Sequence, residues 1–548
     1  MRIKRYTIAI VGSILLISAT IVTNDRLFEI SKNLELFAQV FKELNTNYVD
    51  EVDPSSLMKI GIDAMVASLD PYTNYISESQ VESYRISDDE KYQGIGASLI
   101  VIEDRIYLDA PQSGGPSQIV GMTAGDEILS VNNVPVKGKT AAEVNSVLRG
   151  AAGTTVIVTV KKLLSAENKT YTVKRDEVNI SNVPYSGFVS DGVGYINLTT
   201  FTANSTANIS KALKKLKADN PDMKGVVIDL RFNGGGLLRE AIGIVNLFLP
   251  KGEEVVFTKG KMKDKDQSYK TFAVPEDLDL PIVVMVNGKS ASASEIVAGV
   301  LQDMDRAVII GQRSYGKGLV QNIFDLSYNS RVKVTISKYY IPSGRCIQGV
   351  EYKNGEPMDI SDSKRSKFKT KNGRDVLDGG GITPDVRLTK VTHPEILDAL
   401  LDQKMIFEYA NKFVLKQDSI KNMDEFTFST AQYEDFLGFL KSKKFDFKIS
   451  GEQYIDSLTS KNIASTNLNQ SVKDELNSMK KKVQDIKSKE LTIQKESIIH
   501  ELEKEIVSRY FYQEGRTKIG LKRDSEIQEA IKLLNNRGDY NKLLKIKS

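Results

Sequence analysis

Hydrophobic and polar residues divide the chain into regions with different periodicities. Residues 6–23 carry no charged side chain and follow three basic residues, Arg2, Lys4 and Arg5. An apolar run of about 18 residues is near the lower limit for a helix that crosses a bilayer, and a basic flank is typical of the cytoplasmic end. We predict that residues 1–24 form an uncleaved membrane anchor, with a cleaved signal peptide as the alternative. The rest of the chain would then lie in the cell envelope, on the periplasmic side of the inner membrane.

Residues 25–84 have the pattern of an amphipathic helical segment. Apolar side chains recur every three or four positions and form one stripe: Leu27, Ile30, Leu34, Phe37, Phe41 and Leu44. Such a stripe packs either within its own chain or against a second copy, so the spacing leaves a homodimer open. A second short helix is predicted over 57–69, between a start at Asp53-Pro54 and an end at Asp70-Pro71.

The pattern changes to short strands with glycine turns over 85–167, and then to alternating strands and helices over 168–395. In the latter region, residues 226–230 and 282–286 are continuous apolar runs, and each precedes a helical pattern. Such runs are typical of strands buried on both faces of an α/β sheet. Residues 396–548 are rich in lysine and glutamate and have helical spacing, which predicts a helical C-terminal accessory domain that could also contribute to a dimer.

Composition and charge exclude several classes of site. The 548 residues are 41% hydrophobic and 27% charged, with a net charge of +4, so nothing indicates a nucleic-acid partner. The single cysteine, Cys346, rules out an intrachain disulfide and a cysteine-based zinc site. There are only two histidines, His393 and His500, and a Ser-His-Asp triad would have to use one of them. No metal or cofactor is predicted.

Three serines lie where a predicted buried strand turns into a helix, in the segment Asn287-Gly-Lys-Ser-Ala-Ser-Ala-Ser-Glu-Ile296. A serine at such a junction presents its hydroxyl at the end of the sheet, and the helix N-terminus supplies N–H groups and a favourable dipole. The local pattern favours a nucleophile here, although some of Ser290, Ser292 and Ser294 would serve as helix caps. Spacing alone does not choose among the three.

A lysine between two glycines, Lys317, is the candidate base for such a serine. A buried lysine loses part of its affinity for the proton and can act as a neutral amine. The same stretch, 311–318, is one residue away from a phosphate-binding loop, but Gly318 stands where Ser or Thr would hold Mg²⁺ and a strand pattern follows. A third element, Asp229-Leu-Arg-Phe-Asn-Gly-Gly-Gly236, places glycines after a buried strand, where backbone N–H groups can stabilise an oxyanion.

These blocks, in this order, resemble the C-terminal processing peptidases, also called tail-specific proteases, over roughly residues 30–390. The resemblance also covers Lys338-Tyr-Tyr-Ile-Pro-Ser-Gly-Arg345 and Gly380-Gly-Ile-Thr-Pro-Asp385. It implies an α/β core of the ClpP/crotonase-like type with an inserted β-rich PDZ domain, in addition to the helical N- and C-terminal segments that the spacing predicts. It further implies a serine endopeptidase that uses a serine–lysine dyad and needs no cofactor. The tail beyond about residue 396 is not part of the family's common core, so the resemblance implies no role for it.

The resemblance assigns roles to particular residues. It makes Ser292 the nucleophile, Lys317 the general base and Gln321 the residue that orients the lysine. It places the amides of Ala293 and Gly235 in the oxyanion hole, and it puts Glu295 near the site in a supporting role. Phe232 departs from the family pattern, in which a smaller residue often precedes the asparagine.

Residues 85–167 resemble a PDZ domain. Gly94, Ile95 and Gly96 match the loop that binds a peptide carboxylate, and 124–128 match the turn and strand that are typical of the family. A PDZ domain adds a peptide strand to its sheet edge and captures the terminal carboxylate on backbone amides. The predicted partners are therefore proteins or peptides with accessible C-termini.

Three alternatives remain open from the sequence. A histidine-based triad would require His393 or His500. A catalytically inert PDZ scaffold in the envelope would bind peptides without turnover. The helical tail could also dock a partner that directs proteolysis.

Overall fold

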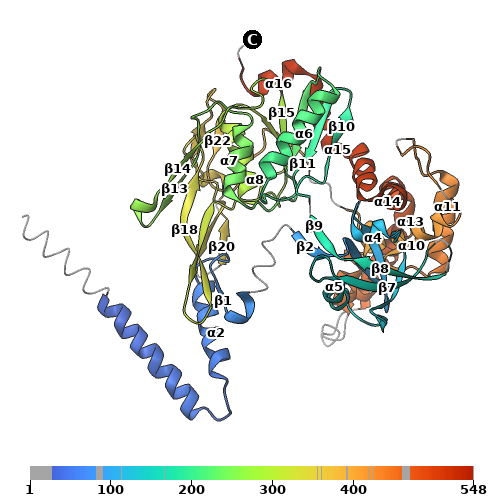
Figure 1. Ribbon diagram of the computed structural model, residues 1–548, viewed down its shortest axis with the longest axis horizontal. Helices are drawn as coiled ribbons and strands as arrows, with labels where there is room; N and C mark the ends of the chain where they lie inside the picture. The colour runs from blue at the N-terminus through green and yellow to red at the C-terminus, as the bar shows by residue number, and fades with distance from the viewer. Residues whose placement is uncertain are drawn as a thin grey trace, which may run out of the picture. The chain divides into compact units, whose positions relative to one another are not determined.

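The computed structural model describes residues 27–546, apart from 82–90, 113, 164, 166, 180, 354–355, 360, 390–392, 418, 424 and 460–469. The chain divides into two compact units, which are drawn in Figure 1. Unit 1 comprises Met1–Glu82, Gln321–Thr335 and Tyr352–Met358, and unit 2 comprises the remainder. The predicted anchor at 1–24 lies outside the described residues. Within the described part of the chain, no helix has both the length and the apolar character needed to cross a membrane.

Unit 1 contains the two N-terminal helices that the sequence predicts. Residues 27–47 are helical, and α2 (Pro54–Ala67) follows. The Asp53 carboxylate starts α2 by accepting hydrogen bonds from the first free N–H groups, those of Ser55 and Ser56. β1 (Asn74–Ile76) pairs antiparallel with the first residues of β18 (Arg331–Tyr340).

Unit 2 begins with the β-rich domain. Its sheet has the order β3-β4-β5-β7-β8, and β6 pairs with β5. The strands are β3 (Ala97–Ile102), β4 (Arg105–Pro111), β5 (Glu127–Val131), β6 (Val134–Pro135), β7 (Thr155–Lys161) and β8 (Asn168–Lys174). The helices are α4 (Pro116–Ile119) and α5 (Ala141–Leu148), and β2 (Lys91–Gly94) pairs with β9 (Asp176–Asn179). β8 pairs with β7 along its whole length, so the strand pairing of this sheet continues beyond the boundary predicted at residue 167.

The α/β region is built on a six-stranded sheet of order β10-β11-β12-β15-β16-β23. Its strands are β10 (Tyr185–Ser190), β11 (Val193–Asn197), β12 (Gly225–Asp229), β15 (Ile282–Val286), β16 (Val308–Gly311) and β23 (Val386–Arg387). β10 is antiparallel to β11, and the other neighbours are parallel. The continuous apolar runs in β12 and β15 are buried at every position, as the sequence predicts for strands covered on both faces.

Different helices cover the two faces of this sheet (Figure 1). On one face, α6 (Ser205–Asp219), α7 (Leu238–Asn246) and α8 (Ala293–Asp303) pack on alternate residues such as Ile228 and Val284. On the other face, α15 (Ser525–Asn535) and α16 (Arg537–Leu543) pack on the intervening residues, such as Val227 and Met285.

The remaining strands are divided between the two units. They are β13 (Glu254–Gly260), β14 (Ser268–Lys270), β17 (Leu319–Asp325), β19 (Val350–Lys353), β20 (Glu356–Asp359), β21 (Lys367–Lys369) and β22 (Asp375–Leu377). Within unit 2, β13 pairs with β14 and with the last residues of β18, which places Tyr339 and Tyr340 beside the loop after β16.

The C-terminal region consists of helices with a core of their own. They are α9 (Glu395–Asp402), α10 (Met405–Val414), α11 (Thr430–Ser442), α12 (Ser450–Thr459), α13 (Gln470–Ile493) and α14 (Lys495–Lys522). Tyr409, Phe436 and Ile506 are among the residues buried in that core. The last two helices, α15 and α16, do not belong to this core but pack on the central sheet.

Candidate active site

The structure separates the three serines at the junction between β15 and α8. The Ser290 hydroxyl donates a hydrogen bond to the Leu230 carbonyl at 2.8 Å, and the Ser294 hydroxyl donates to the Asn233 carbonyl at 2.8 Å. Both side chains are completely buried, whereas Ser292 is only half-buried. Ser290 and Ser294 therefore hold the turn together, and Ser292 is the serine whose position allows a substrate to reach it.

Ser292 occupies a strained position at the start of α8. Its φ of 56° and ψ of −112° are unusual for a residue with a side chain, and such strain is concentrated at functional sites. Ala293 follows as the first helical residue, and no hydrogen-bond partner of its N–H is found among the described residues. A free N–H at a helix N-terminus is suited to bind an oxyanion.

The glycine block after β12 lies directly against Ser292. A Cβ atom added to Gly235 would lie 2.8 Å from the Ser292 Cβ and 3.0 Å from the Ala293 nitrogen, so only glycine permits this approach. Asn233, which is fully buried, fixes the block: its side-chain oxygen accepts the Gly235 N–H at 2.9 Å, and its carbonyl accepts the Ala291 N–H at 3.0 Å. The Gly235 N–H is thus already engaged in this structure.

The loop that carries Lys317 is anchored at several points. The Tyr315 N–H donates to the Ser290 carbonyl at 2.9 Å, and the Tyr339 hydroxyl donates to the Lys317 carbonyl. Gly316 has a φ of 93°, and a Cβ there would lie 2.9 Å from the Cα of Gly349, so glycine is required. The loop continues into strand β17 and not into a helix, which agrees with the rejection of a phosphate-binding loop.

One buried carboxylate joins the serine turn to the lysine loop. Glu295 Oε2 accepts the Ser292 N–H at 2.8 Å and the Lys317 N–H at 2.9 Å. Its Oε1 accepts the Ser314 hydroxyl at 2.5 Å and the Gly316 N–H at 2.7 Å. The backbones of Ser292 and Lys317 are therefore bound to the same oxygen atom, which brings the two predicted catalytic residues together.

Burial has the largest effect on the pKa of this carboxylate. It raises the pKa of Glu295 from 4.5 to about 7, against the lowering effect of the hydrogen bonds from Ser314, Lys317, Ser292 and Gly316. The ionised form matches its surroundings, since a carboxylate accepts all four bonds whereas a protonated one must also place its own proton.

Gln321 lies on β17, four residues after Lys317. Its side chain is half-buried, and its amide donates a hydrogen bond to the Thr335 hydroxyl at 3.2 Å. Thr335 in turn donates to the Asp70 carboxylate at 3.2 Å. The predicted role of Gln321 in orienting Lys317 stays a prediction.

The two histidines occupy other surroundings. His393 Nδ1 lies 3.3 Å from an oxygen of the Asp398 carboxylate, at the exposed start of α9. His500 lies on α14 in the helical region. In the part of the chain that the structure describes, neither has a hydrogen bond to the serine turn 287–293, so the geometry gives no support to a histidine triad.

The predicted carboxylate-binding loop, Gly94-Ile95-Gly96, connects β2 to β3. Gly96 has a φ of 68°, and the Ile95 and Gly96 carbonyls accept hydrogen bonds from Ser117 and Gln112. β3 lies at the end of its sheet with β4 as its neighbour, and α5 packs against it. An edge strand next to a helix is the arrangement that accepts an added peptide strand.

Sequence reasoning missed several residues that hold this site. Asn233 and Ser314 fix the two loops, and Asn287 accepts the Phe232 N–H at 3.0 Å. Each lies inside a block that was singled out, next to a glycine or a candidate catalytic residue. Their polar side chains beside buried strands were the available signal.

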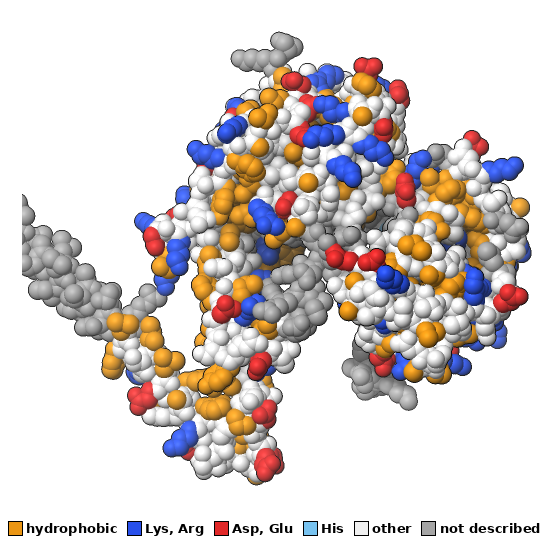
Figure 2. All heavy atoms as spheres, in the orientation of Figure 1, with side chains coloured by type: hydrophobic (Ala, Val, Ile, Leu, Met, Phe, Trp, Pro, Cys, Tyr) orange, Lys and Arg blue, Asp and Glu red, His pale blue; other side chains and the backbone are white. Residues whose placement is uncertain are grey.

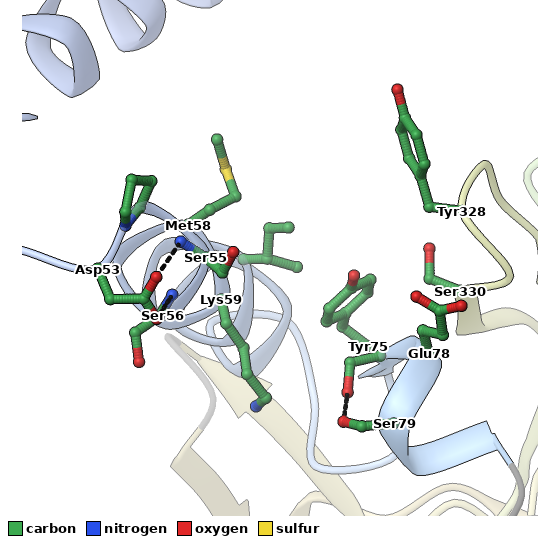
Figure 3. Close-up of a pocket in the computed structure, with 13 residues that line it drawn as sticks. Asp53, Ser55, Ser56, Met58, Lys59, Tyr75, Glu78, Ser79, Tyr328 and Ser330 are labelled. Carbon is green, nitrogen blue, oxygen red and sulfur yellow. Dashed lines mark hydrogen bonds between the residues drawn. The ribbon is translucent and has the colours of Figure 1, made fainter.

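A pocket of about 650 Å³ lies elsewhere, in unit 1. Figure 3 shows it between the start of α2, where Asp53 and Lys59 lie, and the segment that carries Tyr75, with Tyr328 on a separate loop. It contains none of the predicted site residues, so it is separate from the candidate catalytic centre.

Comparison with known proteins identifies the class to which this fold and site belong. The model of "Peptidase family S41" matches residues 192–354, a PDZ domain model matches 108–162, and "Probable PDZ-protease, C-terminal helical domain" matches 396–534. The chain belongs to peptidase family S41 and is a serine-type protease with a PDZ domain and a helical C-terminal domain.

Individual relatives define the branch of the family. A "Carboxy-terminal-processing protease" from Bartonella bacilliformis is 34% identical over 62% of this chain and 78% of its own length. A "Probable CtpA-like serine protease" from Staphylococcus aureus (strain COL) is 33% identical over 64% of this chain and 70% of its own length. Among solved structures, the "Photosystem II D1 C-terminal processing protease" is 26% identical over 64% of this chain and 92% of its own, with a TM-score of 0.36. The family models and the two sequence relatives confirm the resemblance to C-terminal processing peptidases.

Proposed function

We propose that this protease cleaves peptide bonds with a Ser292–Lys317 dyad on a core of the ClpP/crotonase-like type. The observation that carries the proposal is the shared Glu295 oxygen, which binds the backbone N–H groups of both residues. Such preorganisation keeps a nucleophile and its base at a fixed separation before substrate arrives.

The reaction proceeds through an acyl-enzyme. The neutral amine of Lys317 takes the proton of the Ser292 hydroxyl while the oxygen attacks the scissile carbonyl. The Ala293 N–H stabilises the oxyanion, and the Gly235 N–H joins it when it exchanges Asn233 for the substrate oxygen. The C–N bond then breaks, Lys317 returns the proton to the leaving amine, and water hydrolyses the ester with Lys317 again as base. Gln321 orients the lysine during these steps.

Substrate selection is assigned to the PDZ domain. A protein C-terminus adds to the edge of β3, and its carboxylate binds the backbone amides of Gly94, Ile95 and Gly96. The position of β3 at the end of its sheet and the positive φ of Gly96 support this assignment. Substrates are therefore proteins with accessible, extended C-terminal tails.

Substitution of the serine tests the dyad directly. Ser292→Ala should lower kcat on an unfolded protein such as fluorescein-labelled casein by at least about 10⁴-fold, because it removes the attacking oxygen. Ser294→Ala is the matched control, since it removes a hydroxyl two residues away and should leave readily measurable turnover. Lys317→Ala should be as inactive as Ser292→Ala. Full activity in Ser292→Ala would refute the assignment, and mass spectrometry of the products would give the cleavage positions.

A homodimer is proposed through the N-terminal helix, with a contribution from the C-terminal helices. Leu27, Leu34 and Phe37 on residues 27–47 have exposed fractions of 63%, 65% and 47%, and Figure 2 shows the apolar side chains that gather on this segment. Met479 and Ile486 on α13 are also exposed. A continuous exposed apolar stripe of this kind indicates a protein contact.

The oligomeric state tests the dimer. Leu34→Glu should shift the molar mass in light scattering from two chains to one, whereas Gln39→Glu adds the same charge at a polar position of that helix and should not. A monomeric parent protein would contradict the proposal.

We further propose an inner-membrane anchor at residues 1–24, with the protease on the periplasmic side. The uncharged run 6–23 and its basic flank support this location. The full chain should remain with membranes after a carbonate wash, and a variant without residues 1–24 should be released. Release into the wash of a chain that has lost its N-terminal residues would argue for a cleaved signal peptide.

A further inference from the structure

A polar cluster joins three segments that are far apart in the sequence. Arg231 follows β12, Gln312 follows β16, and Asp524 and Glu526 lie at the start of α15. Arg231 Nη1 donates to Glu526 Oε2 at 2.6 Å, and Arg231 Nη2 lies 2.8 Å from Asp524 Oδ2. The Gln312 side-chain amide donates to the other oxygen of Glu526. One carboxylate of the C-terminal region thus holds two loops of the protease core.

The cluster is buried, and its arginine is paired with carboxylates of opposite charge. The side chains of Arg231 and Glu526 are 11% and 9% exposed, and Arg231 also binds Asp229, which accepts the Tyr195 hydroxyl at 2.8 Å. Burial acts to lower the pKa of Arg231, but the carboxylates of Asp229 and Asp524 outweigh it and raise that pKa. Removing one member would leave a buried charge partly uncompensated, which disturbs the loops that carry it.

Both loops lead directly into the catalytic centre. Arg231 is two residues before Asn233, which fixes Gly235 and the serine turn. Gln312 is two residues before Ser314, whose hydroxyl donates to Glu295. Glu295 joins the serine turn to the lysine loop. Glu526 joins the base of the lysine loop to the glycine block, which holds the serine turn through the Asn233 carbonyl.

The helix that carries Glu526 is itself firmly placed. Asp524 caps α15 by accepting the Glu526 and Ile527 N–H groups at 2.9 and 3.2 Å. Ile527 is completely buried against the sheet. In α16, the Tyr540 hydroxyl donates to the Ile282 carbonyl at 3.0 Å. Glu526 therefore contacts the loops from a rigid support.

We infer that Glu526 is a positioning residue of the protease: through Arg231 and Gln312 it sets the spacing of the serine turn and the lysine loop. This inference rests on the proposed Ser292–Lys317 dyad. It assigns the last helices a role in turnover itself, not in docking a partner protein.

Glu526→Ala tests the inference, with Glu529→Ala as its matched control. Glu529 lies on the same helix and is exposed, so its removal costs the same charge without touching the loops. On labelled casein, kcat per folded molecule, with folding measured by circular dichroism, should fall about 10- to 50-fold in Glu526→Ala, because small misplacements of catalytic groups are costly. KM should stay within about twofold, and Glu529→Ala should behave like the parent protein.

The conservative variant separates positioning from stability. Glu526→Gln keeps an oxygen for Arg231, and Gln312 can rotate its amide to match, so its kcat should return to within about threefold of the parent. If Glu526→Ala does not fold, Gln312→Ala breaks only the link to the lysine loop and should lower kcat about fivefold. A lower melting temperature with unchanged kcat per folded molecule, in either variant, would overturn the inference.

The two proposals fail in different ways. Turnover by Ser292→Ala would refute the dyad whatever Glu526 does. An inactive Ser292→Ala together with unchanged kcat in Glu526→Ala would refute only the positioning role.

Discussion

Two amphipathic helical regions near opposite ends of the described chain differ in how far their apolar faces are buried. On the helix over 27–47, Leu34 is 65% exposed. On α15 and α16, the corresponding apolar residues are covered: Ile527 is 0% and Tyr540 2% exposed, against the face of the protease sheet. Both regions show apolar residues at intervals of three and four.

The difference shows that periodicity reveals the face of a helix but not what covers it. The C-terminal helices pack on an apolar sheet face in their own chain, where Val227 and Met285 point toward them. The N-terminal stripe remains open within the described chain, which is why its partner is proposed to be a second copy. The substitutions below separate a covered stripe from an open one.

The largest effect is expected in the covered stripe. Ile527→Ala should lower the free energy of unfolding by about 2–5 kcal/mol, because it leaves a cavity between α15 and the sheet. Chemical denaturation on a Ser292→Ala background, which prevents self-cleavage, measures this. Ile546→Ala, at an exposed position beyond α16, should change it by less than about 0.5 kcal/mol. Equal effects would mean that α15 is not docked.

The burial of Glu295 at the start of α8 should also be visible as a pH dependence of the unfolding free energy. The pKa of Glu295 is raised from 4.5 to about 7 in the folded protein. The folded state therefore holds this proton more tightly than the unfolded chain. Its contribution to stability is fully present below pH 4.5 and is lost as the pH rises through 7, by about 3 kcal/mol in all.

Glu295→Gln isolates that contribution, because the amide cannot ionise while other buried carboxyl groups still can. On the Ser292→Ala background, the unfolding free energy of the protein that keeps Glu295 should fall relative to that of the Glu295→Gln variant as the pH rises from about 5 to about 8. Parallel curves would show that Glu295 titrates normally.

A smaller effect, in the opposite direction, is expected at Phe232. This residue has a φ of 63° and is 69% exposed, with the Lys289 ammonium 5.7 Å from its ring centre. Phe232→Asn should raise the free energy of unfolding by about 1 kcal/mol, since asparagine tolerates the left-handed region better than a bulky residue does. Thermal unfolding checks this, and a loss of stability would indicate that the ring contact outweighs the strain.

The smallest effect on stability is expected in the open stripe. Leu34→Ser should change the free energy of unfolding by no more than about 0.5 kcal/mol at protein concentrations low enough to keep the chain monomeric. A loss comparable to that of Ile527→Ala would show that the stripe is covered after all and would remove the contrast.

The sequence was most informative where chemistry is local. The buried strands β12 and β15, the turn with Ser292 and the glycine-bounded Lys317 could all be located from patterns within a few residues. The family resemblance then chose Ser292 among three serines, and the hydrogen bonds of Ser290 and Ser294 supply an independent physical reason for the same choice.

The sequence was least informative where distant segments meet. Arg231 and Glu526 are separated by almost the whole protease and helical regions, and neither has a neighbour that marks it as half of an ion pair. The hairpin before β8 looked like the end of a domain, because a turn has the same composition whether the next strand returns to the sheet or leaves it. Helical spacing likewise looks the same whether a helix of the tail packs in the helical core or on the central sheet. The docking of α15 and α16 on the sheet was therefore not predicted.

The docking of α15 and α16 on the central sheet has a consequence for biosynthesis. A ribosome delivers β12 and β15 about 300 and 240 residues, respectively, before α15 begins, and α15 and α16 cannot cover that face of the sheet earlier. During this interval the serine turn and the lysine loop lack the contacts of Glu526. Until α15 and α16 have been synthesised, the nascent chain therefore contains the catalytic residues but lacks the contacts that fix their spacing.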